Sequence, residues 1–357
     1  MSKTFLVMAG GTGGHVYPAL AAAQELRAQG ARVVWLGSVG GMEERIIANT
    51  DIPLRLLSIS GLRGKGLLTL VKAPLNLARA LWQAYQVYRQ EHPDCVLGMG
   101  GFAAGPGGIL AMLTRTPMVI HEQNAIAGLT NRWLAKWAKV VLQAFPGAFS
   151  AANKVHTVGN PVRKELANLP EPGQRDIGER APTVVILGGS RGALALNEMV
   201  PAAFGKLEAG QRPRIIHQAG AGKEQECRER YDTEGVKAEV FDFLHDMTAI
   251  YEQADLVICR AGALTLTELT AVGIGAILVP YPYAVDDHQT ANARYLEAAG
   301  AAIIFQQADL SVDLLAKTIS EMLSQPQRLL HMAVKARQLA QPEATQMVAQ
   351  YCMEACA

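Results

Sequence analysis

The chain has 357 residues, of which 33 are Lys or Arg and 32 are Asp or Glu, so its formal net charge is +1. This balance gives no overall argument for a nucleic-acid partner, and any charged partner must be met by a local patch. The length predicts two domains, because a single hydrophobic core seldom extends beyond about 250 to 300 residues. The 5 cysteines are scattered without metal-ligand spacing, which is typical of free thiols in a reducing compartment.

Short runs rich in Val, Ile and Leu alternate with helical patterns, which predicts an α/β fold whose parallel sheets are covered on both faces. The expected strands are 4–9, 32–36, 54–59, 94–97, 117–121, 140–143, 155–158, 183–187, 214–218, 238–243, 256–259, 276–280 and 302–305. Gly159-Asn-Pro-Val-Arg163 and the polar stretch 168–182 indicate a hinge between the two halves. These patterns predict domains at 1–162 and 163–340, with a C-terminal helix in 341–357 packing back onto the first domain.

Two apolar stretches bear on export and membrane insertion. The run that ends at Ala9 is too short for a signal peptide. The longest uncharged run, Cys95 to Thr114, is interrupted by glycines and Pro106, so it predicts a strand, a loop and a helix. We therefore expect neither export nor a membrane span.

One unusual local pattern occurs twice. Apolar runs lead into Gly10-Gly-Thr-Gly-Gly-His15 in the first half and into Gly188-Gly-Ser-Arg-Gly192 in the second, and a helical pattern follows each. Glycine permits a positive φ and a close approach of a ligand to the main chain, while a helix start offers unpaired N–H groups. The two copies indicate two α/β halves that face each other across a cleft, each with a phosphate- or sugar-binding rim. A plain tight turn is the alternative interpretation.

His15 is a candidate general base. We expect it in the first turn of a helix, where the helix dipole disfavours the imidazolium ion and keeps a neutral ring available to accept a proton.

A third glycine cluster, Gly98-Met-Gly-Gly-Phe-Ala-Ala-Gly-Pro-Gly108, contains a match to the dinucleotide fingerprint. Glu122 stands near the expected distance of about 20 residues from it. Extra glycines and Pro106 interrupt the match, and Glu122 belongs to the polar segment His121-Glu-Gln-Asn124. We therefore expect this loop to line the same cleft as the first glycine turn, with a nicotinamide cofactor as the weaker alternative.

Two segments of the second half suggest a ligand site. In Cys259-Arg-Ala-Gly-Ala-Leu-Thr-Leu-Thr-Glu268, the spacing of Thr265 and Glu268 is that of a capping box. The alternative is a helix start that binds a diphosphate, with Glu268 accepting hydrogen bonds from a ribose. Asp286-Asp-His-Gln-Thr-Ala-Asn292 follows a strand end, where open α/β sheets bind ligands, although a solvated loop would have a similar composition.

The sequence contains no pattern typical of a metal site. The 8 histidines are dispersed and no Asp-x-Asp occurs, so we expect no metal. Helix N-termini and basic side chains such as Arg163 would then neutralise a leaving diphosphate.

Gly61-Leu-Arg-Gly-Lys-Gly66 precedes an apolar and aromatic helical pattern over 67–88 with basic neighbours. That pattern predicts a helix packed on its own sheet or, alternatively, a face that meets anionic lipid.

Six segments in order carry a resemblance to a known family: 10–15, 98–102, 121–124, 159–163, 188–193 and 260–268. Together they resemble the MurG family, bacterial N-acetylglucosaminyltransferases that complete the lipid-linked peptidoglycan precursor. The resemblance implies a GT-B fold, two Rossmann-like doubly wound domains facing each other across a cleft. The first domain would face the acceptor and the membrane, and the second would bind the UDP-sugar.

The resemblance also implies the reaction. It is an inverting, metal-independent transfer from UDP-N-acetylglucosamine to the 4-hydroxyl of the muramoyl sugar in undecaprenyl-diphospho-muramoylpentapeptide, without a cofactor. The enzyme would be a peripheral protein at the cytoplasmic face of the bacterial inner membrane, serving cell-wall synthesis, cell shape and division. Its partners would be an anionic membrane surface and other cell-wall synthesis proteins, with no nucleic acid.

The same resemblance implies a role for each site residue. Thr12, Gly13, Gly14 and Asn124 would contact the donor sugar, and His15 would deprotonate the attacking hydroxyl, with Glu122 as its competitor. The nucleotide and its phosphates would be held by Arg163, Ser190, Leu244, Ala263, Leu264, Thr265, Leu266, Thr267, Glu268 and Gln289, with Glu268 on the ribose. The glycine loops of the first domain would receive the acceptor diphosphate.

Two positions depart from the family pattern, and three other functions remain open. Arg191 stands where glutamine is usual, and Phe102 where tyrosine is common. The alternatives are a related enzyme acting on another lipid acceptor such as diacylglycerol, a UDP-N-acetylglucosamine 2-epimerase, and a nucleotide-sugar sensor without turnover.

Overall fold

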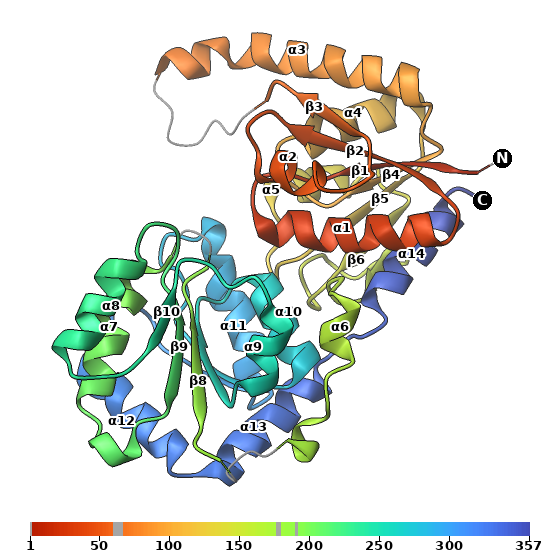
Figure 1. The fold of residues 1–357 in the computed structure, drawn as a ribbon. Coiled ribbons are helices and arrows are strands. Elements are labelled where there is room, and N and C mark those ends of the chain that lie inside the picture. The colour runs from red at the N-terminus through yellow and green to blue at the C-terminus, as the bar shows by residue number, and fades with distance from the viewer. Residues whose placement is uncertain (1, 60–66, 176–179, 190–191) are drawn as a thin grey trace. The chain divides into compact units, whose positions relative to one another are not determined.

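The computed structural model describes residues 2–59, 67–175, 180–189 and 192–357. The chain divides into two compact units (Figure 1). Unit 1 comprises Met1–Arg163 and Gln341–Ala357, and unit 2 comprises Lys164–Ala340.

Unit 1 contains a seven-stranded parallel sheet in the order β3-β2-β1-β4-β5-β6-β7. The strands are β1 Thr4–Met8, β2 Arg32–Ser38, β3 Leu54–Leu57, β4 Cys95–Gly98, β5 Met118–Glu122, β6 Val140–Gln143 and β7 Val155–Thr157. The strand order reverses direction between β1 and β4, where Phe5 pairs with Val33 on one side and with Cys95 on the other. Doubly wound sheets bind ligands at the carboxyl ends of the strands beside such a reversal.

Helices cover both faces of this sheet, which explains why its strands are apolar throughout (Figure 1). The helices are α1 Gly13–Ala28, α2 Met42–Ile47, α3 Leu67–Glu91, α4 Ala104–Thr114, α5 Leu129–Leu134 and α14 Ala344–Ala355. Phe5 and Val7 share a core with α1 and α14, whereas Leu6 and Met8 share one with α3 and α4. The C-terminal helix α14 is therefore part of unit 1.

Unit 2 has the same topology with one strand fewer. Its parallel sheet has the order β10-β9-β8-β11-β12-β13. The strands are β8 Thr183–Leu187, β9 Arg214–Gln218, β10 Glu239–Phe241, β11 Leu256–Cys259, β12 Gly275–Leu278 and β13 Ala302–Ile304. The helices are α6 Lys164–Ala167, α7 Leu194–Gly205, α8 Glu224–Thr233, α9 Met247–Gln253, α10 Ala263–Val272, α11 His288–Ala298, α12 Val312–Leu323 and α13 Pro326–Gln338, with short 3₁₀ helices at Pro172–Gln174, Ala209–Gln211 and Val285–Asp287.

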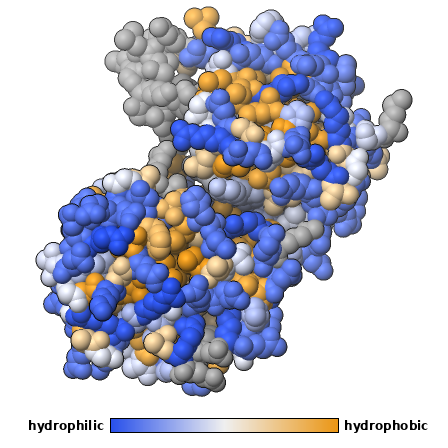
Figure 2. Space-filling model, in the orientation of Figure 1, coloured by the Kyte–Doolittle hydropathy of each residue, from blue (hydrophilic) through white to orange (hydrophobic). Residues whose placement is uncertain are grey.

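The two units repeat a hydrogen bond at the start of their central strands. In unit 1, the carboxylate of Asp94 accepts from the main-chain nitrogen of Thr4 at 2.7 Å, and in unit 2 Asp255 accepts from Thr183 at 2.7 Å. Each acid directly precedes the strand that pairs with β1 or β8. On the face drawn in Figure 2, hydrophobic residues gather within each unit and hydrophilic residues surround them.

The expected parallel α/β architecture is confirmed. Every expected strand overlaps an observed one, and 140–143, 183–187, 214–218 and 256–259 match β6, β8, β9 and β11 end to end. The segment 95–114, expected to be a strand, a loop and a helix, is β4, a glycine turn and α4. No helix among the described residues is long and apolar enough to cross a membrane.

Candidate functional site

Two glycine turns of unit 1 lie against each other at the carboxyl ends of β1 and β4. The β1–α1 turn comprises residues 9–12, and the β4–α4 turn comprises residues 99–103. Gly101 has a φ of +86°, and a Cβ placed there would lie 2.4 Å from the carbonyl oxygen of Gly10. Only glycine therefore allows this contact between the turns. The third glycine cluster therefore adjoins the first, and both turns lie at the strand-order reversal.

His15 is the third residue of α1, as expected, and its ring contacts the β4–α4 turn. A Cβ on Gly100 would lie 3.1 Å from the Nδ1 and Cε1 atoms of His15. The main-chain nitrogen of His15 donates to the carbonyl of Thr12 at 3.0 Å, within the first turn of the helix. The side chain is half-buried.

A chain of hydrogen bonds fixes the orientation of the His15 ring. The Nδ1 of His15 lies 2.8 Å from Oε1 of the buried Gln123, and Nε2 of Gln123 lies 3.2 Å from Nδ1 of His121. The Nε2 of His121 lies 2.9 Å from the carbonyl oxygen of Gly159. Burial lowers the pKa of His121 to about 4, so this ring is neutral at pH 7.

These contacts assign a tautomer to each ring. A carbonyl oxygen only accepts, so His121 donates from Nε2 to Gly159, and its Nδ1 accepts from the amide nitrogen of Gln123. The amide oxygen of Gln123 then accepts from Nδ1–H of His15. The Nε2 of His15 has no hydrogen-bond partner among the described residues, so it is the ring atom that can accept a proton from a ligand.

Glu122 has a different role from His15 in this structure. Its side chain is 1% exposed, and Oε1 accepts from both nitrogens of Asn124 at 3.0 and 3.1 Å. Oε2 accepts from the main chain of Gly128 at 3.0 Å and from Nδ2 of Asn131 at 2.9 Å. The carboxylate thus holds the β5–α5 loop, residues 123–128, in place, and the geometry favours His15 over Glu122 as the base.

In unit 2, helix α10 begins at the carboxyl end of β11, beside the strand-order reversal between β8 and β11. Gly262 is the N-cap and no side chain caps the helix, so the capping-box interpretation of Thr265 and Glu268 is wrong. Thr265 lies inside the helix because the glycine immediately before Ala263 already adopts the extended conformation of an N-cap. The first amides of α10 are therefore left for a ligand or water.

Glu268 lies in the second turn of α10 and is 8% exposed. Its Oε2 accepts from the hydroxyl of the buried Tyr251, at 3.0 Å. This bond orients one carboxylate oxygen from the α9 side. The other residues expected on α10 differ in burial: Ala263 and Leu266 are buried, whereas Leu264, Thr265 and Thr267 are half-buried.

The remaining expected residues of unit 2 follow other strands. Leu244, after β10, is buried. Gln289, in the first turn of α11, accepts from the main chain of Tyr281 through Oε1 at 2.9 Å. Asn292 is fully buried and donates to the carbonyl of Ala261, so it supports the turn that precedes α10.

Several other expected positions lie outside the described residues or are exposed. Ser190, Arg191 and the segment 61–66 lie outside the described residues. Arg163 is the last residue of the first segment of unit 1 and is exposed. Phe102 is 48% exposed in the β4–α4 turn. Within the described part of the chain, no group of three or more His, Cys, Asp or Glu side chains is arranged to hold a metal ion.

Comparisons with known proteins agree with this arrangement. Residues 5–143 match the N-terminal domain of glycosyltransferase family 28, and residues 183–349 match its C-terminal domain. A UDP-N-acetylglucosamine–N-acetylmuramyl-(pentapeptide) pyrophosphoryl-undecaprenol N-acetylglucosamine transferase of Hahella chejuensis is 68% identical over 99% of both chains. The crystal structure of Acinetobacter baumannii MurG superposes with a TM-score of 0.85 at 41% identity, covering 99% of each chain. The chain belongs to the MurG family.

A more distant structural neighbour of this MurG-family chain shows the fold alone. The UDP-GlcNAc 2-epimerase of Neisseria meningitidis has a TM-score of 0.69 over 99% of this chain and 100% of the other, at 12% identity. The two proteins therefore share two doubly wound units, and this likeness carries no argument for epimerase activity.

The site of this MurG-family chain includes two residues that sequence patterns did not reveal. Gln123 was noted only as part of a polar segment, and its partner His15 is 108 residues away. Glu43, on α2, is fully buried behind the β1–α1 turn and accepts from Gly11. An acid in a short helix with charged neighbours is normally exposed, so only the fold reveals its position.

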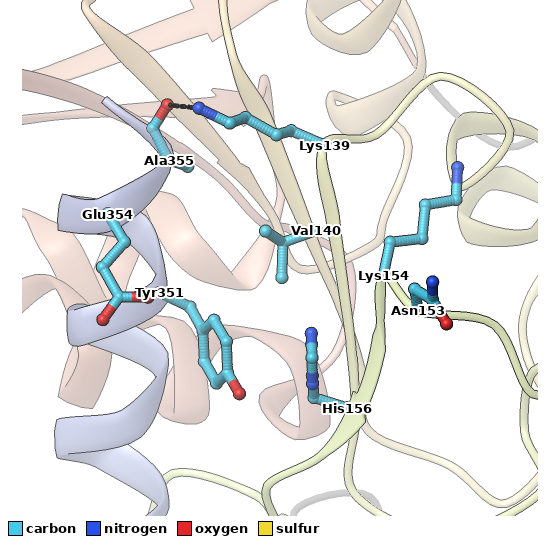
Figure 3. A pocket seen from close by; sticks show the side chains of 8 residues that line it. All are labelled: Lys139, Val140, Asn153, Lys154, His156, Tyr351, Glu354 and Ala355. Carbon is cyan, nitrogen blue, oxygen red and sulfur yellow. Dashed lines mark hydrogen bonds between the residues drawn. The ribbon is translucent and has the colours of Figure 1, made fainter. Parts of the chain in front are cut away.

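A surface pocket of about 360 Å³ lies at the opposite end of the unit 1 sheet (Figure 3). It is lined by Lys139, Val140, Asn153, Lys154, His156, Tyr351, Glu354 and Ala355. Lys139 donates to the carbonyl of Ala355 at 2.9 Å, and the ring of His156 stacks on that of Tyr351. These contacts fasten α14 to the amino ends of β6 and β7, far from the carboxyl ends that carry the site.

Proposed function

We propose that this chain transfers N-acetylglucosamine from UDP-N-acetylglucosamine to the 4-hydroxyl of the muramoyl sugar of undecaprenyl-diphospho-muramoylpentapeptide, in peptidoglycan synthesis. The similarity to the Hahella transferase carries the proposal, because 68% identity spans 99% of both chains and its name gives this donor sugar and this class of acceptor. The geometry of His15 supports it, since Gln123 binds its Nδ1 and its Nε2 is then the atom that suits the deprotonation of a sugar hydroxyl.

In the proposed mechanism, Nε2 of His15 takes the proton of the 4-hydroxyl while the oxygen attacks the anomeric carbon. The bond from that carbon to the UDP oxygen breaks on the opposite face, so the configuration inverts. UDP leaves with the bonding electron pair, and the amides at the start of α10 and the guanidinium of Arg163 stabilise its growing charge. Main-chain donors and a fixed cation can supply this stabilisation without a divalent metal.

The substrate contacts belong to the same proposal. Thr12, Gly13, Gly14 and Asn124 contact the donor sugar, and the glycine turns of unit 1 receive the acceptor diphosphate. Ser190, Leu244, the α10 residues Ala263 to Glu268, and Gln289 hold the nucleotide. Glu268 accepts from the ribose, and the hydroxyl of Tyr251 at 3.0 Å supports its carboxylate in that orientation.

The proposal includes peripheral attachment to an anionic membrane at its cytoplasmic face, because the acceptor carries a polyprenyl chain. On α3, Leu75, Trp82 and Tyr85 are 74%, 60% and 46% exposed.

Helix α4 packs against both α3 and α5. Trp133 and Trp137, on and after α5, are exposed with ring centroids 4.6 Å apart. Exposed aromatic residues beside Arg79, Arg89 and Lys136 are typical of surfaces that bind anionic lipid.

Release of UDP tests the reaction. We expect the purified chain to release UDP from UDP-N-acetylglucosamine only when a polyprenyl-diphospho-muramoylpentapeptide is present, and to do so at an undiminished rate in EDTA. Turnover of the donor without an acceptor would indicate an epimerase, and transfer to diacylglycerol would indicate another lipid acceptor. Donor binding without turnover would indicate a sensor.

Co-sedimentation with vesicles tests the membrane attachment separately. We expect binding to vesicles that contain phosphatidylglycerol and much weaker binding to pure phosphatidylcholine. The double variant W82S/Y85S should lose most of this binding, whereas F241S, an exposed aromatic substitution in unit 2, should keep it. Equal binding by both variants would contradict a membrane role for α3.

A further inference from the structure

Glu43 is a carboxylate enclosed in the core of unit 1. The side chain lies on α2 and is fully buried. No basic side chain in the described part of the chain forms an ion pair with it. A buried charge without a counter-ion is costly unless hydrogen bonds compensate it, so its partners should explain its position.

Three donors converge on the Glu43 carboxylate. Oε1 accepts from the main-chain nitrogen and from the hydroxyl of Ser38, both at 2.7 Å. Oε2 accepts from the main-chain nitrogen of Gly11 at 3.1 Å. Ser38 ends β2, and Gly11 lies in the β1–α1 turn. The carboxylate therefore joins the end of one strand to the glycine turn that follows its neighbour.

Glycines create the space that this carboxylate occupies. A Cβ on Gly10 would lie 2.3 Å from Oε1, and a Cβ on Gly41 would lie 2.3 Å from Oε2. A Cβ on Gly37 would lie 2.7 Å from Cγ of Glu43. Three glycines thus leave room for one side chain. Gly10 therefore packs against the Glu43 carboxylate, whether or not a ligand also contacts the turn.

The hydrogen bond from Gly11 to Glu43 lies next to the first turn of α1, which contains His15. Gly11 precedes Thr12, and the carbonyl of Thr12 accepts from the main chain of His15 at 3.0 Å and of Val16 at 3.2 Å. Holding Gly11 therefore sets the start of α1 and with it the position of the His15 ring.

We propose that Glu43 is a positioning residue for the transfer reaction, acting through Gly11 to hold the β1–α1 turn in the shape that places His15. This inference rests on the proposed function for its effect on turnover. Because Gly11 N–H already donates to Glu43, this N–H is not available to an acceptor diphosphate. The diphosphate must use the amides that follow at the start of α1.

The substitution E43Q tests the proposal with little change in shape. The main-chain N–H of Ser38 requires an oxygen, so the new amide nitrogen faces Gly11 N–H, and two donors then oppose each other. We expect turnover to fall at least about tenfold, the usual size of losing a hydrogen bond to a charged group, and by a larger factor than the donor KM rises. Hydrogen exchange of the segment 10–15 should accelerate by a similar factor.

Two controls separate positioning from general stability. E44Q neutralises the next residue of α2, whose carboxylate accepts from Gly40 instead of the glycine turn, and it should keep wild-type turnover and exchange. S38A removes one bond to Oε1 but leaves Gly11 bound, so it should lower the melting temperature without slowing turnover. Equal loss of turnover in S38A and E43Q would overturn the proposal.

Exchange in the wild-type protein keeps the test independent of both folding and activity. We expect the Gly11 amide to be protected in the ligand-free wild type to about the same degree as the Ser38 amide, since both bind one carboxylate. Rapid exchange of Gly11 would overturn the role of Glu43 even if E43Q failed to fold. A wild type that released no UDP would contradict the proposed function but would leave the exchange result intact.

Discussion

The Nδ1 atom of His15 lies 2.8 Å from the Oε1 atom of Gln123, and this bond joins α1 to the loop after β5. Because the oxygen of Gln123 can only accept, His15 donates from Nδ1, and Nε2 is the atom that we propose faces the substrate. The amide of Gln123 is itself oriented by His121, whose ring is kept neutral by burial. The proposed base is thus oriented by two buried residues, Gln123 and His121, which are not expected to touch substrate.

Replacing Gln123 by methionine should lower turnover without weakening the binding of the sugar donor. The substitution Q123M keeps the length of the side chain but leaves the His15 ring without its acceptor, so the ring can rotate or change tautomer. We expect kcat to fall about tenfold or more, a part of the 10² to 10⁴-fold that general base catalysis contributes. The donor KM, measured from UDP release, should change by less than about threefold.

A buried glutamine on the next strand provides the control for Q123M. Gln143 ends β6, and its amide donates to the hydroxyl of Thr157 at 2.9 Å, with no partner on α1. We expect Q143M to lower the melting temperature as Q123M does, but to keep kcat within about twofold. If both variants lost turnover equally, the effect would come from packing and the proposed orientation of His15 would be refuted.

Removing the base itself should have a larger effect. In H15A, we expect kcat to fall by about 10² to 10⁴-fold at neutral pH, while UDP binding measured by calorimetry stays the same, because the nucleotide is assigned to unit 2. The change creates little cavity strain, since the side chain is only half-buried. An unchanged rate would show that His15 is not the base and would favour Glu122 in that role.

The strands could be predicted from the sequence because their apolar runs are contiguous. In β8 and β11, every residue is buried on both sides of the sheet, so the run itself marks the strand. The glycine turns could be predicted for the same local reason. The capping-box interpretation of Thr265 and Glu268 was wrong, because Gly262 is the N-cap of α10 and Thr265 lies inside the helix.

The supporting residues could not be predicted, because their partners are distant in sequence. Glu43 is 32 residues from Gly11, and nothing in its charged helix distinguishes it from Glu44, which reaches only Gly40. Gln123 is one of several polar residues after β5, and only the fold shows which of them points at His15. Local patterns reveal elements and turns, whereas these contacts depend on how separate βα units meet.

Glu268 should govern donor affinity more than the rate of transfer. In E268A, the ribose would lose a charged acceptor, so we expect the donor KM to rise about tenfold or more while kcat falls less than threefold. Y251F removes the hydroxyl that donates to Glu268 and should raise the same KM by a smaller factor, about two- to fivefold. An unchanged KM in E268A would mean that the carboxylate serves only as a partner for Tyr251.

Two buried histidines should make stability depend on pH from about 6.5 downward, starting above the range in which most carboxylates titrate. Burial lowers the pKa of His121 to about 4 and that of His217 to about 3, from the ordinary value of 6.5. Below pH 6.5, the unfolded chain binds a proton at each ring and the folded chain does not, so the free energy of unfolding falls as pH falls. The contribution of each ring is complete above pH 6.5 and is lost as pH approaches its folded pKa.

Urea unfolding of unit 2 between pH 6.5 and 5 isolates the contribution of His217. This ring contacts the hydroxyl of Tyr231 at 2.9 Å and the amide oxygen of Asn197 at 3.1 Å. We expect H217Q to reduce the slope of unfolding free energy against pH by up to about 1.4 kcal/mol per pH unit, the value for one proton. H245Q, at an exposed position, should leave the slope unchanged. A slope that persisted in H217Q would show that His217 is protonated in the folded protein, and its place in the buried network with Asn197 would then need another explanation.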